Sequence, residues 1–248
     1  MKSFSIKTKL ILFLAGFAVF LSVKDRDAAF LLIMVVALIS AIAADLTLSY
    51  LKDKKLSIPE SSAISALIIG FVLASDNPWW ITSLASLFAV SSKYLIRFNK
   101  RHVFNPAAFG IFLSIILFGA NTQWKGTFLW YILLPAGLYF SYKIRKLELI
   151  TGYLITALGL FGIQAVLNKV PLINIFGYLS YFYIFVMLIE PKTTPIKPLA
   201  KLTFGIGAAG LIFIFIQAQV SFDSELAALL ILNLFVPLLN KIPERRKA

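Results

Sequence analysis

The sequence predicts an all-α polytopic membrane protein, with about ten transmembrane helices in a 5+5 inverted repeat whose helices are interrupted at matching places. Three observations support this fold class. Hydrophobic residues make up 60% of the chain and charged residues only 14%, and the mean hydropathy is +0.88. The apolar residues gather in runs that suit membrane-crossing helices. The segments between the runs alternate between rich and poor in basic residues, as expected of a chain that crosses a bilayer repeatedly.

The apolar runs follow one another along the whole chain, separated by short polar segments. Several runs are shorter than the roughly 20 residues that a helix needs to cross about 30 Å of hydrocarbon, so their ends are only loosely defined. The polar segments are too short to fold separately, and we expect a single membrane domain over residues 1–248. The expected spans are 9–23, 28–51, 62–75, 81–96, 104–119, 127–144, 149–167, 172–190, 202–218 and 225–240.

The distribution of lysine and arginine predicts the orientation of the chain. Both termini and the alternate loops between them hold 20 of the 24 basic residues, whereas the other loops hold 4. By the positive-inside rule, both termini lie in the cytoplasm and the protein is a multi-pass protein of the prokaryotic plasma membrane. The formal net charge of +13 is then an orientation signal. It does not indicate a nucleic-acid partner, and membrane lipid is the expected environment.

The composition also limits the chemistry. The chain has no cysteine and a single histidine, His102. Disulfides, thiolate zinc sites, protein-ligated iron–sulfur clusters and bis-histidine haem are therefore excluded within one chain, and no metal site is expected. Redox chemistry here would need an organic cofactor.

The ten spans divide naturally into two halves, with repeat one at about residues 1–120 and repeat two at about 121–248. Because each half would have an odd number of helices, the second half runs through the membrane in the opposite direction. The third helix of each half ends in an acidic and proline-containing segment, at 75–80 and 190–195, and the fifth carries asparagine and proline, at 105–106 and 233–237. Such breaks are tolerated in lipid only where protein or water covers the backbone, which favours a polar site between the repeats. An ordinary turn or kink is the alternative.

Two of these breaks contain candidate ligand-binding residues. Asn105 and Pro106 suit the cap and first position of a helix, whose positive end could face an anionic or electron-rich ligand, although a capped helix alone would use the same residues. Glu190, Thr193 and Thr194 combine a carboxylate with two hydroxyls, which could hold a cation or the polar edge of a ligand. The alternative for Glu190 is a solvated pair with a nearby lysine.

Asp45 is the candidate for an ion pathway, together with Glu190. It lies inside the run 28–51, where an unpaired carboxylate costs about 2.5 to 3.5 kcal/mol on insertion scales. It should therefore face water or a partner, and the candidates are Lys93, the nearby Thr47 and Ser49, or an ion in transit. A structural ion pair is the alternative.

Trp79 and Trp80 fall at the predicted outer interface of the membrane. Their amphipathic rings favour the headgroup layer, so anchoring is the simplest interpretation. The alternative is that they stack on a flat cofactor such as a flavin or a quinone.

Three segments together resemble those of the RnfD/NqrB family, the ten-helix membrane subunits of Rnf and sodium-translocating NADH:quinone oxidoreductase complexes. They occur in the expected order and spacing over most of the chain. They are Pro78-Trp79-Trp80 with a helix leading to Lys93, Phe104-Asn105-Pro106-Ala107 with Gly110, and Met187 to Pro195. The resemblance implies the fold and a membrane role near redox or transport chemistry. It also implies a flavin, with Asn105, Pro106, Thr193, Thr194, Trp79 and Trp80 as candidate binding residues.

The chain departs from the family in two places. Glu190-Pro191 stands where the family usually has Asp-Pro. In the family a threonine of an S-G-A-T-like motif carries FMN covalently in the stretch after the fifth helix, and the connection Ala120–Gly126 has no such motif. Covalent FMN is therefore not expected, whereas non-covalent FMN or riboflavin remains open.

Three functions are consistent with these features. The first is a membrane-embedded electron-transfer component with non-covalent flavin and coupled ion movement, which would need redox partner subunits. The second is a small-solute or ion transporter or channel without a cofactor. The third is a non-catalytic scaffold protein, for which the buried polar residues would pair only with one another.

Overall fold

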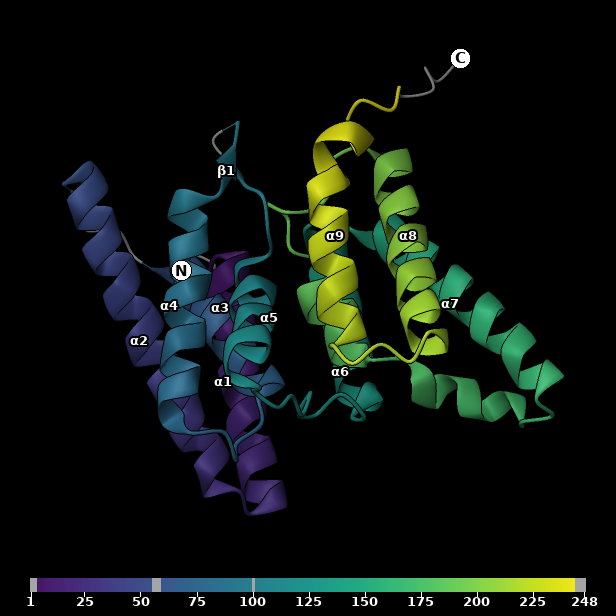
Figure 1. Cartoon of the computed structure of the whole chain (residues 1–248), viewed down its shortest axis with the longest axis horizontal. Coiled ribbons are helices and arrows are strands. Elements are labelled where there is room, and N and C mark those ends of the chain that lie inside the picture. The colour runs from purple at the N-terminus through teal and green to yellow at the C-terminus, as the bar shows by residue number, and fades with distance from the viewer. Residues whose placement is uncertain (1–3, 55–58, 100, 244–248) are drawn as a thin grey trace. The chain divides into compact units, whose positions relative to one another are not determined.

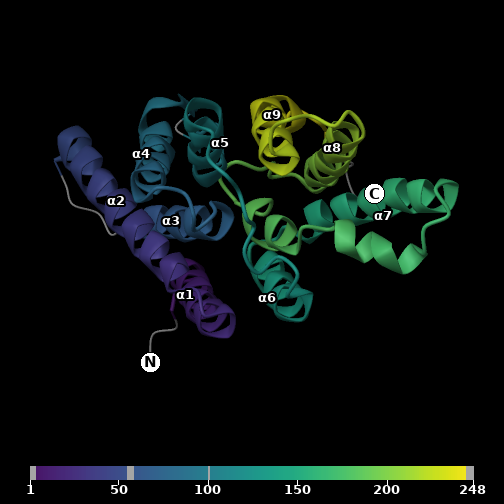
Figure 2. The same cartoon turned by 60° about the horizontal axis from the view of Figure 1, so that its bottom comes forward.

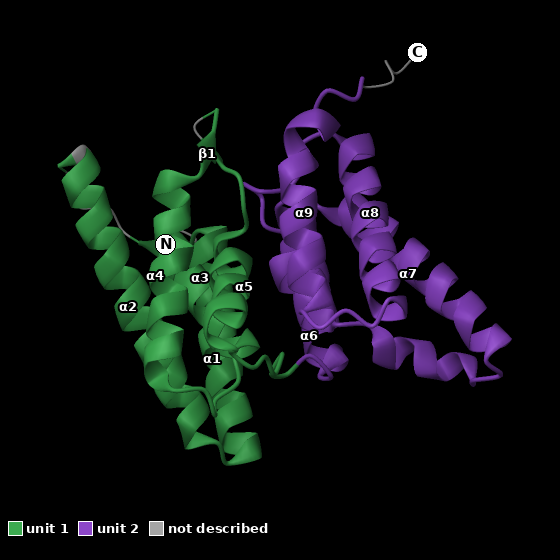
Figure 3. Ribbon diagram, in the orientation of Figure 1, with its two compact units in different colours: residues 1–126 green, residues 127–248 purple. Residues whose placement is uncertain are grey.

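The computed structural model describes residues 4–54, 59–99 and 101–243, and most of these residues are helical (Figure 1). The chain forms two compact units, residues 1–126 and residues 127–248 (Figure 3). Each unit corresponds to half of the expected spans and has its own core.

The first unit is a helical bundle with a short hairpin. Helix α4 packs between α2 and α5, and α3 lies against α1 and α2 (Figure 2). The hairpin pairs Arg97 with His102 and turns the chain from α4 into α5, so these two helices are antiparallel. Its elements are α1 (Ile6–Asp25), α2 (Ala28–Asp53), α3 (Glu60–Val72), α4 (Trp79–Leu95), β1 (Arg97–Phe98), β2 (Arg101–His102) and α5 (Pro106–Phe118).

The second unit is built around α7 and α8, which pack along their lengths, with α9 against α8 (Figure 2). Glu148 meets Lys201 near the start of the two helices, and Gln164 meets Gln217 near their ends. Helices α7 and α8 therefore run in the same direction. The elements are α6 (Trp130–Lys143), α7 (Leu147–Leu167), the 3₁₀ helix η1 (Leu172–Tyr178), the π-helix η2 (Tyr183–Met187), α8 (Pro198–Gln217) and α9 (Ser224–Leu239).

Among the described residues, nine of the ten expected spans contain an α-helix, and the span 172–190 is the exception. That span divides into η1 and η2 at residues 179–180, after Gly177 near the end of η1 and at Ser180, and Pro171 precedes it. Four helices in the described part are long and apolar enough to cross a bilayer, namely α1, α2, α7 and α8; α3, α5 and α9 are shorter apolar helices. The all-α membrane fold with interrupted helices is thus confirmed.

Residues after α5 provide hydrogen-bond donors for backbone carbonyls at the end of the short helix α3. The amide of Gln123 donates to the Val72 carbonyl at 2.8 Å and that of Lys125 to the Phe71 carbonyl at 2.7 Å. The Asn77 side chain donates to the carbonyl of Asn121 at 2.9 Å and accepts from its amide at 3.0 Å. The backbone exposed by this break is therefore satisfied by protein, as a low-dielectric surrounding requires.

The second unit uses an asparagine in a similar way. Asn233 of α9 is buried and donates from Nδ2 to the carbonyl of Thr193, at 2.9 Å, in the break that follows η2. In each unit an asparagine side chain thus joins the break after the third segment to the fifth helix or to the chain directly following it.

Glycines allow the closest helix contacts. A Cβ on Gly110 of α5 would overlap the Ala85 carbonyl of α4, and one on Gly205 of α8 would overlap the Leu149 carbonyl of α7. Small residues at such crossings let helix backbones approach, which is a main source of helix association in membranes.

Replacing Gly110 with valine should force α4 and α5 apart. The added side chain would meet backbone rather than a flexible side chain, so we expect a loss of stability of at least about 1 to 3 kcal/mol. The measurement is thermal unfolding in mild detergent. Gly16→Val on α1 is the matched control, because nothing lies within 4 Å of a Cβ there; an equal loss in both variants would contradict the contact.

A second prediction concerns the turn before α2. Asp27 caps α2 by accepting from the Phe30 amide at 3.0 Å. The pKa of its carboxyl lies below the usual 3.8, chiefly because the Lys125 ammonium donates to it; the Phe30 amide and Ser75 hydroxyl add to this effect and burial opposes it. Because the folded pKa is depressed, its stabilisation is complete above 3.8 and disappears as the pH falls through the folded value. We expect acidification below 3.8 to lower the melting temperature of the wild type more than that of Lys125→Gln. Equal acid sensitivity would contradict this.

Candidate functional site

A buried charged cluster lies among three helices of the first unit. Asp45 of α2 and Lys93 of α4 form an ion pair at 3.3 Å, with side chains only 8% and 9% exposed. The Lys93 ammonium also donates to Ser62 Oγ of α3, and the Tyr94 hydroxyl donates to the Asp45 carboxylate at 2.8 Å. The structure therefore pairs Asp45 with Lys93, one of the partners expected from sequence.

The Lys93 ammonium in this cluster is paired with one carboxylate oxygen and one hydroxyl oxygen. An ammonium group and a hard metal cation both seek carboxylate and hydroxyl oxygens. Here one carboxylate, from Asp45, and one hydroxyl, from Ser62, surround the Lys93 nitrogen. The cluster lies in the cytoplasmic half of the unit according to the predicted orientation.

Two further polar groups lie on the same side of α4. Thr82 and Ser86 are fully buried, and their hydroxyl oxygens have no hydrogen-bond partner within the part of the chain that the structure describes. At about 100° per residue, Thr82, Ser86 and Lys93 fall within one narrow stripe of the helix. Buried hydroxyls of this kind usually bond to water or to a ligand.

The remaining candidates of the first unit lie apart from one another. Asn105 caps α5, with its Oδ1 accepting from the Ala108 amide at 3.0 Å, and Pro106 is the first residue of that helix. Trp79 and Trp80 begin α4, where they are 64% and 42% exposed. Since α4 and α5 are antiparallel, these two pairs lie at opposite ends of the helix pair.

In the second unit, Glu190, Thr193 and Thr194 come together as expected from sequence. The Thr193 hydroxyl donates to the Glu190 carboxylate at 3.2 Å, and the Thr194 hydroxyl donates to the Glu190 carbonyl at 2.6 Å. Both threonines are buried and Glu190 is half-buried. The hydroxyls thus hold the break after η2 in shape, and the assignment of a ligand or ion to them stays a prediction.

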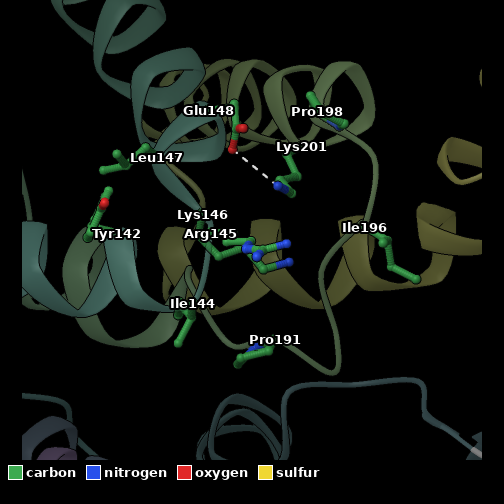
Figure 4. A pocket seen from close by; sticks show the side chains of 10 residues that line it. All are labelled: Tyr142, Ile144, Arg145, Lys146, Leu147, Glu148, Pro191, Ile196, Pro198 and Lys201. Atoms are coloured by element: carbon green, nitrogen blue, oxygen red, sulfur yellow. Dashed lines mark hydrogen bonds and ion pairs between the residues drawn. The ribbon is translucent and has the colours of Figure 1, made fainter. Parts of the chain in front are cut away.

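A basic pocket at the starts of α7 and α8 was not anticipated from the sequence (Figure 4). Its volume is about 580 Å³, within the range of small-molecule sites. Three cationic side chains, Arg145, Lys146 and Lys201, face one carboxylate, Glu148. The other lining residues are Tyr142, Ile144, Leu147, Pro191, Ile196 and Pro198.

The lysines of this pocket are held in place by the surrounding chain. Lys146 is buried and donates to the Pro195 carbonyl at 2.7 Å, and Lys201 donates to the Glu148 carboxylate at 3.2 Å. The alternating charge pattern contains Arg145 and Lys146, but it assigns them only to orientation. That the segment 191–201 would fold back beside them depends on long-range packing, which no local pattern reveals.

Groups of three or more His, Cys, Asp or Glu residues that could hold a metal ion are absent from the described residues.

Comparison with known proteins identifies the family. The sequence model of the NQR2, RnfD, RnfE family matches this chain in two segments, residues 3–128 and residues 126–248. The chain belongs to this family. The two segments meet within a few residues of the boundary between the two compact units.

Two curated RnfD proteins, both named as subunits of an ion-translocating oxidoreductase complex, are similar to part of the chain. The one from Erwinia tasmaniensis is 29% identical over 96 residues, or 37% of this chain and 27% of that protein. The one from Colwellia psychrerythraea is 32% identical over 94 residues, or 36% of this chain and 27% of that protein. The matched part thus spans about a quarter of the length of these RnfD proteins.

The Asp45–Lys93 pair of this family member should be sensitive to losing one partner. Asp45→Asn leaves the Lys93 charge buried without its counter-ion, which costs about 3 to 5 kcal/mol in buried pairs. Asp45→Asn combined with Lys93→Met removes both charges and should recover most of that loss. Thermal unfolding of the three proteins in detergent is the measurement. If the single variant is as stable as the wild type, the pair is not buried as described.

Proposed function

We propose that this chain is the membrane subunit of an ion-translocating oxidoreductase complex, and that the first unit carries part of the ion path. Family membership and the names of the similar RnfD proteins support the type of complex. The observation that carries the proposal is the buried Asp45–Lys93 pair with its hydroxyl partners. Placing an ionisable group at this depth in a membrane costs free energy, and such a group is therefore taken to indicate a functional site.

In this proposal, the ammonium of Lys93 controls whether a cation can bind to the Asp45 carboxylate. A cation that reaches Asp45 competes with Lys93 for the same carboxylate, so binding requires the lysine to move away or to lose its proton. Ser62 offers an oxygen to either occupant, and Tyr94 holds the Asp45 carboxylate in place. The pair therefore prevents a free charge from remaining in the low-dielectric interior when the cation is absent.

Glu190 is the corresponding candidate in the second unit. It is half-buried, and its carboxylate accepts from the Thr193 hydroxyl. As a carboxylate next to a helix break, it could receive a cation close to the membrane surface.

A non-covalent flavin, FMN or riboflavin, completes the proposal as the redox group. Trp79 and Trp80 fit this role best among the candidate residues, because both side chains are exposed and the Trp80 ring lies edge-on to Phe118 with 5.4 Å between the ring centroids. Asn105 and Pro106 lie at the other end of α4 and α5, and the Thr193 and Thr194 hydroxyls are engaged by Glu190. A bound flavin would supply the electron-transfer chemistry, and the chain would supply its orientation.

The proposed setting is the prokaryotic cytoplasmic membrane, with both termini on the cytoplasmic side and with redox partner subunits in the complex. The excess of basic residues in the alternate loops supports the orientation. The similar RnfD proteins are named as subunits of a complex, which supports the presence of partner subunits.

The proposal is tested on the chain extracted gently from its own membranes with any bound partners. We expect visible flavin absorption, and ion uptake into proteoliposomes that depends on electron transfer. Asp45→Asn combined with Lys93→Met should abolish ion uptake while the flavin absorption and the melting temperature are kept. Asp25→Asn combined with Lys24→Met removes one charge of each sign from the more exposed ion pair at the end of α1, so it is the charge-matched control and should retain uptake.

Two results would contradict the proposal. Full ion uptake by the double variant would remove Asp45 and Lys93 from the path. Absence of flavin even after it is supplied, together with solute flux that needs no electron donor, would instead indicate a cofactor-free transporter or channel.

A further inference from the structure

The start of α7, beside the basic pocket of the second unit, corresponds to the start of α2 in the first unit. The two helix starts differ in the charge of the residue at the cap position. Helices α2 and α7 are the second helices of their units, and each follows a tight turn. In both turns an arginine adopts the left-handed conformation directly before the helix cap, Arg26 with φ 54° and Arg145 with φ 57°. The following residue is the cap, Asp27 in one unit and Lys146 in the other.

The first unit supplies its own anion at this place. The Asp27 carboxylate accepts from the Phe30 amide of α2 and from the Lys125 ammonium. It thereby satisfies an amide of the first turn that has no partner within the helix, and it places a negative charge at the positive end of α2. It also neutralises the charge of the lysine.

The second unit has cations where the first has this carboxylate. Lys146 provides no side-chain cap for α7, and Lys197 provides none for α8. Because α7 and α8 are parallel, the positive ends of both helices lie beside the same pocket. Glu148 pairs with Lys201, but no carboxylate pairs with Arg145 in the part of the chain that the structure describes.

We propose that this pocket binds the phosphate group of an anionic ligand, which takes the place that the Asp27 carboxylate fills in the first unit. The guanidinium of Arg145 and the ammonium groups of Lys146 and Lys201 line the pocket, and such groups form strong charge-assisted hydrogen bonds with phosphate oxygens. Lys146 provides no side-chain cap for α7, so first-turn amides other than that of Glu148, whose own carboxylate accepts from it, are further donors for the same oxygens.

The surroundings of the pocket favour an anionic phospholipid as the source of this phosphate. Exposed apolar or aromatic side chains, Tyr142, Leu147 and Ile196, border the cations, so an acyl chain can leave the pocket along an apolar surface. The charge pattern predicts that this end of the unit faces the cytoplasm, where basic pockets between helices bind anionic headgroups. A soluble phosphate compound, such as flavin mononucleotide, would use the same cations.

The test uses the full chain, stripped of lipid in an uncharged detergent. Binding of phosphatidylglycerol, phosphatidylcholine, inorganic phosphate and flavin mononucleotide is measured by native mass spectrometry. Arg145→Gln should weaken binding of the anionic probe about tenfold, the usual scale for losing one charge-assisted contact. Lys146→Asp, which restores the carboxylate found in the first unit, should abolish it. Lys192→Gln removes an exposed charge that does not line the pocket and should leave binding unchanged.

The outcomes separate the two sources. Phosphatidylglycerol binding that both pocket variants lose assigns the site to lipid, whereas the same loss for inorganic phosphate or flavin mononucleotide alone assigns it to a soluble phosphate compound. Equal binding by the wild type and Arg145→Gln for every probe overturns the proposal. Equal retention of phosphatidylglycerol and phosphatidylcholine, with no binding of either soluble phosphate probe, also overturns it. Arg145 is exposed, so this variant decides the matter even if Lys146→Asp fails to fold. Loss of the proposed ion path would leave all of these results unchanged.

Discussion

The hydrogen-bonding requirement of backbone in lipid is the constraint on which the rest of this structure depends. Each unit contains a segment that stops short of the membrane thickness, and each break exposes amides and carbonyls that lipid cannot satisfy. In the first unit the chain after α5 returns to bond with Phe71 and Val72. In the second, Asn233 bonds to Thr193.

The general architecture could be predicted from sequence because it depends on strong, repeated signals. Long apolar runs and alternating loop charge predicted the membrane-crossing helices, and the helix starts at Asp27 and Asn105 follow from ordinary capping chemistry. The division of span 172–190 into η1 and η2 was not predicted. Its apolar composition is that of a membrane helix, and Gly177 and Ser180 are weak local signals.

The candidate sites were predictable only where one residue carried the signal. A carboxylate within an apolar run identified Asp45, and Lys93 could be named as a partner because both residues lie near the same end of their helices. The basic pocket escaped detection because its residues come from the turn before α7 and from the start of α8, far apart in the chain. The separation of Trp79 and Trp80 from Asn105 and Pro106 also needed the structure, since it follows from the antiparallel packing of α4 and α5.

The position of Asp45 between two neighbouring residues of α4 limits how the first unit can move. Lys93 and Tyr94 both contact the same carboxylate from α2, so sliding one helix along the other would separate opposite charges in a medium that screens them poorly. Helices α2 and α4 should therefore move together for as long as Lys93 stays paired with Asp45. Because Lys93 also donates to Ser62 of α3, a conformational cycle that keeps this pair would have to displace α1 or α5 around the three joined helices.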